Sequence, residues 1–283
     1  MPELPPAARL GAFGVALVAV LAGSLALGRA TGEVAQAEPA PAQAPHEAGH
    51  DAGPEAPVSG AANGTSLSAD GYRLDVPVAV LPPSQATLWS FRVLGPDGDP
   101  VLDYDLEQGK ELHLVLVSRD LSRSAHLHPE RSADGTWSTR LTLSPGAYRA
   151  VADFSTGGTR RSLGVDLTAP GPLEPSSLPS PAASVVVDDL RLELERDADT
   201  LTFTAFRGDE PFVSEPYLGA RGHLTAFRAG DLAYAHVHPA GEDGAATSYD
   251  AELPGPGTYR LFLELQVDGQ VRTFPFTLEV SSS

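Results

Sequence analysis

The sequence has 283 residues, no cysteine and one methionine, Met1. These counts exclude disulfides, thiolate nucleophiles and sulfur-ligated metal sites, so a bound metal must be held by imidazole, carboxylate, backbone or water. The formal net charge of −18 has the wrong sign for binding a phosphate backbone, and we expect no nucleic-acid partner.

The first 29 residues contain an uncharged, largely apolar run, Leu10–Gly28, with an arginine on either side. Its roughly 18 residues lie at the lower limit for a bilayer-spanning helix and exceed the usual core of a signal peptide. We expect residues 1–29 to form a helical anchor that crosses the cell membrane once and leaves the rest of the chain outside the cytoplasm. The alternative is a signal segment cleaved near Ala37, which would give a secreted protein.

Composition divides the remainder into a tether, two repeats and a linker. Residues 30–69 are rich in Ala, Pro, Gly and acid, with almost no large apolar side chain, which predicts a disordered tether. Residues 169–183 are rich in Pro and Ser, which is typical of an interdomain linker. The segments 70–168 and 184–281 each have about 100 residues, enough for one small domain.

One motif in the predicted tether has the spacing of a zinc protease, His46-Glu-Ala-Gly-His50. That chemistry requires both histidines on one face of a helix. Gly49 and the surrounding prolines oppose a helix here, so we interpret the motif as solvated tether. Loose cation capture by its imidazoles and acids is the alternative.

Each repeat consists of short apolar alternations broken by Gly, Pro and Asp, which favours strands over helices. The predicted strands of the first repeat are Tyr72–Val80, Thr87–Leu94, Lys110–Ser118, Ser124–His128, Thr136–Leu143, Ala147–Phe154 and Arg161–Leu167. Those of the second are Val185–Glu195, Leu201–Phe206, His223–Arg228, Ala233–His238, Thr247–Leu253, Thr258–Val267 and Val271–Val280. About seven strands in about 100 residues predict an all-β chain with two tandem immunoglobulin-like antiparallel β-sandwiches. Tyr148 and Tyr259, each after a Pro-Gly turn, resemble the tyrosine corner of such domains.

The two repeats share a histidine pattern, H-x12-H-x-H-P, at positions 110 residues apart. Its members are His113, His126 and His128 in the first repeat and His223, His236 and His238 in the second. The neighbouring residues repeat as well, which indicates a duplicated module. Because imidazole is the commonest protein metal ligand near neutral pH, our leading hypothesis is a three-histidine site for Cu(II) or Zn(II) in each repeat.

Strand parity places these histidines on the outward faces of their sheets, because side chains two residues apart share a face. The same parity leaves Asp153 and Glu264 outward on the sixth strands. Third and sixth strands are neighbours in an immunoglobulin-like sandwich, so we expect Asp153 near His113 and Glu264 near His223. Each carboxylate is a candidate fourth ligand, or the acceptor of the second imidazole N–H.

Three arrangements of the histidines are open at this point. Each repeat binds one metal, or the two triads face each other across the domain interface and share one site, or the duplication retains no site and the imidazoles bond to backbone near turns. Capture by neutral imidazoles predicts an affinity that decreases below about pH 6.5, because protons compete for the ligands.

The paired motifs also carry a resemblance. Ala125-His-Leu-His-Pro, Tyr148-Arg-Ala-Val-Ala-Asp-Phe154, Tyr217-Leu-Gly-Ala-Arg-Gly-His223-Leu and Ala235-His-Val-His-Pro resemble those of a group of exported bacterial proteins with an apolar N-terminal segment next to the membrane. The resemblance covers roughly residues 70–280. It implies export and heavy-metal handling, and no mechanism.

We therefore expect a non-enzymatic, extracytoplasmic, membrane-tethered protein that binds Cu(II) or Zn(II), with no protein partner indicated. One alternative is a zinc metalloenzyme, because His-x-His on one strand with a third histidine on a neighbour resembles the zinc site of α-type carbonic anhydrases. Another is an adhesion or scaffold module without a metal.

Overall fold

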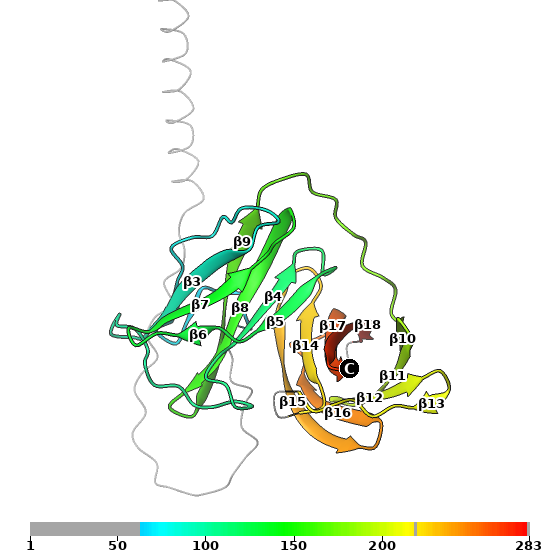
Figure 1. Ribbon diagram of the computed structural model, residues 1–283. Coiled ribbons are helices and arrows are strands. Elements are labelled where there is room, and N and C mark those ends of the chain that lie inside the picture. Colours follow the sequence, from blue (N-terminus) through cyan, green and yellow to red (C-terminus); the bar gives the residue numbers. More distant parts are fainter. Residues whose placement is uncertain (1–62, 218–219, 282–283) are drawn as a thin grey trace, which may run out of the picture. The chain divides into compact units, whose positions relative to one another are not determined.

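The computed structural model describes residues 63–217 and 220–281, and all regular elements in these ranges are β-strands (Figure 1). This confirms the predicted all-β class. The predicted anchor, and the tether as far as residue 62 with His46 and His50, lie outside the described residues. Within the described ranges, no helix is long and apolar enough to cross a bilayer. The described residues all belong to one compact unit.

The first repeat is a sandwich of two antiparallel sheets. Its strands are β1 Ser68–Ala69, β2 Tyr72–Asp75, β3 Thr87–Leu94, β4 His113–Ser118, β5 Ser124–Leu127, β6 Glu130–Arg131, β7 Thr136–Leu141, β8 Gly146–Thr156 and β9 Thr159–Ala169. One sheet has the order β1-β2-β3-β7-β6 and the other the order β5-β4-β8-β9. The pairing of β4 with β8 is that of the third and sixth strands in an immunoglobulin domain.

The second repeat follows the same plan after residues 170–183, which contain no strand. Its strands are β10 Ser184–Val187, β11 Leu190–Asp197, β12 Thr200–Arg207, β13 Glu210–Pro211, β14 His223–Arg228, β15 Tyr234–Asp243, β16 Ala246–Glu252, β17 Gly257–Val267 and β18 Gln270–Val280. The long strand β15 pairs with β14 at its start and with β16 over the rest of its length. It therefore joins the two layers, in the order β10-β11-β12-β16-β15-β14-β17-β18.

One predicted strand, Val185–Glu195, is in fact a hairpin. Its two arms are β10 and β11, paired from Val187 and Leu190 outward. The chain turns at Asp188, which has a left-handed φ of 54°. Aspartate tolerates that conformation, but the segment lacks the glycine or proline that would announce a turn.

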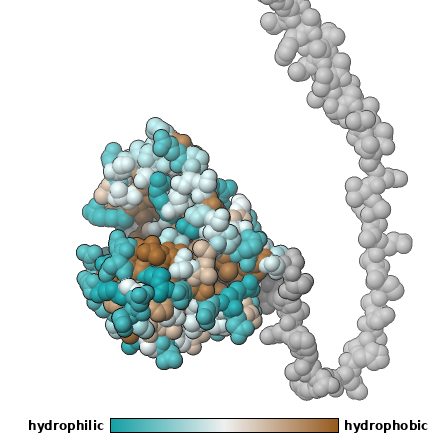
Figure 2. Space-filling view, turned by 90° about the vertical axis from the view of Figure 1, so that its right-hand side faces the viewer, coloured by the Kyte–Doolittle hydropathy of each residue, from teal (hydrophilic) through white to brown (hydrophobic). Residues whose placement is uncertain are grey.

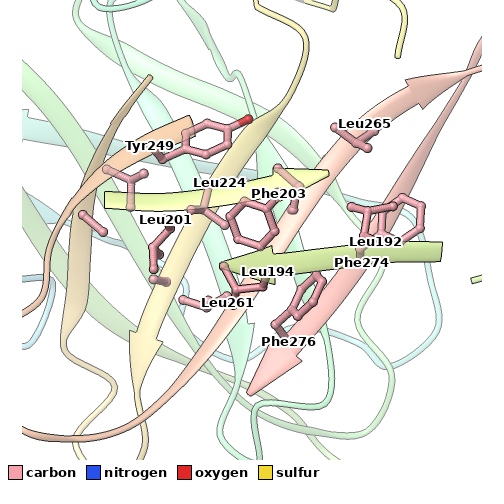
Figure 3. Close-up of a cluster of buried hydrophobic side chains, with 14 of the residues drawn as sticks. Leu192, Leu194, Leu201, Phe203, Leu224, Tyr249, Leu261, Leu265, Phe274 and Phe276 are labelled. Carbon is pink, nitrogen blue, oxygen red and sulfur yellow. The ribbon is translucent and has the colours of Figure 1, made fainter. Parts of the chain in front are cut away.

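Each sandwich has its own apolar core. The first contains both tryptophans, Trp89 and Trp137. Figure 3 shows the second, in which Phe203 and Phe276 lie among leucines. The predicted tyrosine corners are also confirmed. The Tyr148 hydroxyl donates to the Ser144 carbonyl at 2.9 Å, and the Tyr259 hydroxyl donates to the Gly255 carbonyl at 2.7 Å.

A third apolar cluster joins the two repeats. Its members are Val115, Val117, Leu121, Val151, Phe227, Leu232, Tyr234 and Phe262. None is more than 6% exposed. Leu114 and Leu116 lie in the core of the first sandwich, so the predicted parity of this strand is correct. The outward faces of β4 and β8 do not face solvent, because they pack against β14, β15 and β17.

Hydrophilic residues predominate on the face of the molecule shown in Figure 2, with a smaller area of apolar residues among them. The buried cluster between the repeats thus contrasts with the largely polar face seen in this view.

The first described residues run between the repeats. The Asn63 carbonyl accepts the Tyr234 N–H at 2.7 Å, and the Gly64 N–H donates to the Ser162 carbonyl at 2.9 Å. A Cβ added to Gly164 would lie 1.8 Å from the Gly64 carbonyl oxygen. Glycine is therefore required at position 164 for this close backbone approach.

We predict that Gly164→Ala lowers the free energy of unfolding by about 1–3 kcal/mol, the usual cost of overpacking. Denaturant titration of the full-length chain measures this. Gly241→Ala is the control, because nothing lies within 4 Å of its added Cβ, and its effect should be within about 0.5 kcal/mol of zero. Equal losses for the two variants would contradict the close approach.

Candidate metal centre

The three histidines of the first repeat meet where the chain crosses from one sheet to the other. His113 opens β4, and His126 lies in β5. His128 and Pro129 lie between β5 and β6, which belong to different sheets. Proline has no N–H to give to a sheet, so it suits a point at which strand pairing is interrupted. The His-x-His-Pro motif thus places two imidazoles at a sandwich edge.

One nitrogen from each of these three rings points to a common centre. His113 Nδ1 lies 2.9 Å from His126 Nε2 and 3.2 Å from His128 Nε2. One ligand atom from each ring lies within 4.8 Å of the other two. Nitrogens bound at about 2.05 Å to a tetrahedral metal are about 3.3 Å apart. The triad could therefore hold a metal ion with small adjustments of the rings.

A backbone carbonyl sets the tautomer of His113. Its Nε2 lies 3.0 Å from the Glu107 carbonyl oxygen. A carbonyl can only accept, so Nε2 carries the proton and Nδ1 carries a lone pair. That one lone pair faces a nitrogen from each of His126 and His128, and it is suited to a single well-aligned hydrogen bond. A cation at the centre would satisfy all three nitrogens at once.

In the second repeat, too, a backbone carbonyl accepts the Nε2 proton of the first histidine. His223 Nε2 lies 2.9 Å from the carbonyl oxygen of Tyr217, again six residues earlier in the chain. In both repeats this carbonyl belongs to a tight turn, because Glu107 and Lys110 exchange two backbone hydrogen bonds, as do Tyr217 and Ala220. An orienting carbonyl behind the imidazole is the usual support of a metal-binding histidine.

Sequence reasoning missed these two carbonyls. The available signal was a glycine four residues before each first histidine, Gly109 and Gly219. Gln108 and Gly109 both have positive φ, 48° and 75°. That combination is typical of a two-residue hairpin turn.

Burial favours the neutral form of three of these imidazoles, those of His126, His128 and His223. His113 and His223 are only 5% and 3% exposed. Burial, reinforced by the neighbouring imidazoles, lowers the pKa of His128 to about 4 and holds the pKa of His126 well below its usual value. Burial also lowers the pKa of His223. Neutral imidazole is the form that binds metals, so these three rings are in the correct protonation state at neutral pH.

The expected neighbour of His113 is present in the predicted register. Asp153 lies opposite His113 in the pairing of β4 with β8. Its carboxylate is 1% exposed and accepts hydrogen bonds from Arg160 Nη2 at 2.5 Å and Ser162 Oγ at 2.8 Å. The Tyr234 hydroxyl reaches it from the second repeat at 3.5 Å. Asp153 thus belongs to an ion-pair network, and the Nε2–H of His113 is bonded to the Glu107 carbonyl.

Glu264 and His223 approach the first triad from the other repeat. They lie opposite each other in the pairing of β14 with β17, as predicted. Burial raises the pKa of Glu264 to about 7, opposed by a hydrogen bond from the His126 backbone. The ring centroids of His126 and His223 are 5.5 Å apart, with the planes at 71°. The candidate site therefore lies at the contact between the sandwiches.

A cavity of about 100 Å³ adjoins these rings. Its walls include His113 and His126 from the first repeat and His223 from the second. Asp153 and Arg160 add charged groups to the same wall. The volume accommodates a few water molecules.

The backbone of His236 and His238 pairs with a different strand from that of His126 in the first repeat. His236 lies opposite Glu252 and His238 opposite Asp250, both in β16. In the first repeat, by contrast, His126 still pairs with Val115 of β4. The side chains of His236 and His238 lie outside the described residues, so a separate second triad stays a prediction.

Several solved structures resemble the chain at low similarity, and no curated protein matches it. The FdeC adhesin of Escherichia coli is 14% identical, with 77% of this chain and 66% of that chain covered and a TM-score of 0.26. InvD of Yersinia pseudotuberculosis is 13% identical, with 77% and 59% covered and a TM-score of 0.25. A DUF4785 family protein of Legionella pneumophila is 13% identical, with 74% and 55% covered and a TM-score of 0.26. The chain thus spans less than two thirds of the length of each, and no functional inference follows from likeness at this level.

A family match covers most of the chain. Residues 67–171 and 185–282 match the family described as "Domain of unknown function (DUF8832)". The two segments correspond to the two sandwiches and to the two copies of the histidine pattern. The chain therefore belongs to this family and contains its domain twice.

Proposed function

We propose that this chain binds a transition-metal ion, Zn(II) or Cu(II), through His113 Nδ1, His126 Nε2 and His128 Nε2. The observation that carries the proposal is the convergence of these nitrogens within 4.8 Å of one another. Role and location follow from the sequence. We propose non-enzymatic metal capture outside the cytoplasm, with the apolar run Leu10–Gly28 as the membrane anchor.

The chemistry of the surroundings supports this choice. Three neutral imidazoles without sulfur ligands suit Zn(II) and Cu(II) better than Cu(I). Glu264, whose pKa is raised by burial to about 7, lies close enough to accept the His126 N–H. A cation in the triad favours the ionised form of this carboxyl, so binding near neutral pH displaces a proton and leaves a compensating negative charge.

Removing one ligand tests the assignment. In the full-length chain with His46→Ala and His50→Ala, which removes both tether histidines, calorimetric titration should show one zinc site. His128→Ala should weaken it by more than about 100-fold, because loss of an outer partner alone typically costs 10- to 100-fold. Ser124→Ala, in the same β-strand region but outside the triad, should bind normally. Unchanged zinc affinity in His128→Ala would refute the triad.

The pH dependence distinguishes a buried cluster from exposed histidines. Burial lowers the pKa of His128 to about 4 and holds the pKa of His126 well below its usual value, so protons compete with zinc for these two ligands only in acid. Zinc affinity should therefore stay nearly constant from pH 7 to about pH 5 and then decrease about tenfold per pH unit for each imidazole protonated. The measurement uses Glu264→Gln, because the Glu264 carboxyl itself titrates near neutral pH. A decrease that begins at pH 6.5 in this variant would contradict the burial of the ligands.

The cavity favours one second candidate, a zinc metalloenzyme. An ion held by three histidines has a fourth position, and about 100 Å³ beside His126 has room for a bound water. Hydratase or esterase activity that appears on zinc loading and is lost in His128→Ala would support it. Zinc-loaded protein without either activity would leave metal capture as the function.

A further inference from the structure

We propose that His223 supplies the fourth ligand, so that one metal ion joins the two sandwiches. This inference rests on the proposed function, because it assumes that the triad binds the ion. It assigns to His223 a role in the site of the first repeat.

The ring of His223 lies almost as close to the triad as the triad members lie to one another. Its centroid is 5.5 Å from that of His126, whereas the centroids within the triad are 4.9, 5.0 and 5.1 Å apart. Among the residues that the structure describes, the group within 4.8 Å consists of the three triad nitrogens. A short movement of the His223 ring is therefore part of the proposal.

The tautomer of His223 suits the role. Its Nε2 proton is directed at the Tyr217 carbonyl at 2.9 Å, so the lone pair is on Nδ1. His113 has the same arrangement, with its lone pair on Nδ1 and its proton on the Glu107 carbonyl. The site would thus combine two Nδ1 ligands, one from each repeat, with two Nε2 ligands from the His-x-His pair.

The rings also share one buried environment. His113, His126 and His223 line the same cavity. Two of the rings, His113 and His223, are at least 95% buried. A cation among the four rings would meet four ring nitrogens that can each donate a lone pair.

The contact between the repeats holds His223 in place. His113 and Val117 share one face of β4, and His223 and Phe227 share one face of β14. Val117 and Phe227 are both fully buried in the cluster between the repeats. The same packed surface therefore positions a ligand from each sandwich. An ion bound to both would stabilise that contact further.

X-ray absorption of the zinc-loaded full-length chain, with His46→Ala and His50→Ala, counts the imidazoles. We expect four in this protein and three in His223→Ala. Zinc affinity should decrease by more than about tenfold, the least that loss of an outer partner costs, and stay measurable because three imidazoles remain. His223→Asn serves if the alanine variant does not fold. Thr225→Ala is the matched control, because Thr225 is buried on the same face of β14 and has no imidazole. This control should keep four imidazoles and full affinity.

A second measurement needs no change at His223. Two-bond nitrogen–proton NMR correlations of the imidazoles should show the Nδ1 signal of His223 moving on zinc addition together with Nδ1 of His113. Three imidazoles in the parent chain, an Nδ1 signal of His223 that does not move, or four imidazoles retained in His223→Ala would each overturn the bridging role while leaving the triad intact. Absence of zinc binding by the parent chain would overturn the proposed function itself.

Discussion

The packing of two sheet faces against each other sets the properties of the candidate site. Val115 and Val151 of the first repeat meet Phe227 and Phe262 of the second, and each is at most 3% exposed. Because this contact excludes water, the pKa values of His126, His128 and His223 are lowered from the usual value near 6.5. The same contact brings His223 and Glu264 to the triad. The metal binding that we propose would therefore depend on the contact between the repeats.

The tight turn before β4 and its counterpart before β14 fix the tautomers of His113 and His223. Each presents one carbonyl, from Glu107 or Tyr217, to the Nε2 proton of the histidine six residues later. The opposite nitrogen of each ring is left with its lone pair directed away from the turn. Duplication of this unit gives each sandwich one histidine with its Nδ1 lone pair directed away from the turn, and both would serve the single shared ion that we propose.

Much of the architecture could be predicted from periodicity. The covering of the outward sheet faces and the partner of Asp153 could not, for physical reasons. Alternation correctly placed Leu114 in the core of its sandwich and His113 opposite Asp153. It cannot say what covers an outward face. The signal for a covered face was present in the run Leu112–Val117, where apolar residues occupy both parities. The preference of Asp153 for Arg160 was beyond prediction, because it depends on which of several nearby donors the side chain reaches.

The central claim is that the triad of the first repeat holds a metal ion within the contact between the sandwiches. A crystal structure of the zinc-loaded full-length chain, with anomalous data on either side of the zinc absorption edge, tests it most directly. The account predicts one strong anomalous peak per chain, about 2 Å from His113 Nδ1, His126 Nε2 and His128 Nε2. A zinc-saturated crystal with no peak there, or with zinc only at His46 and His50, would contradict it.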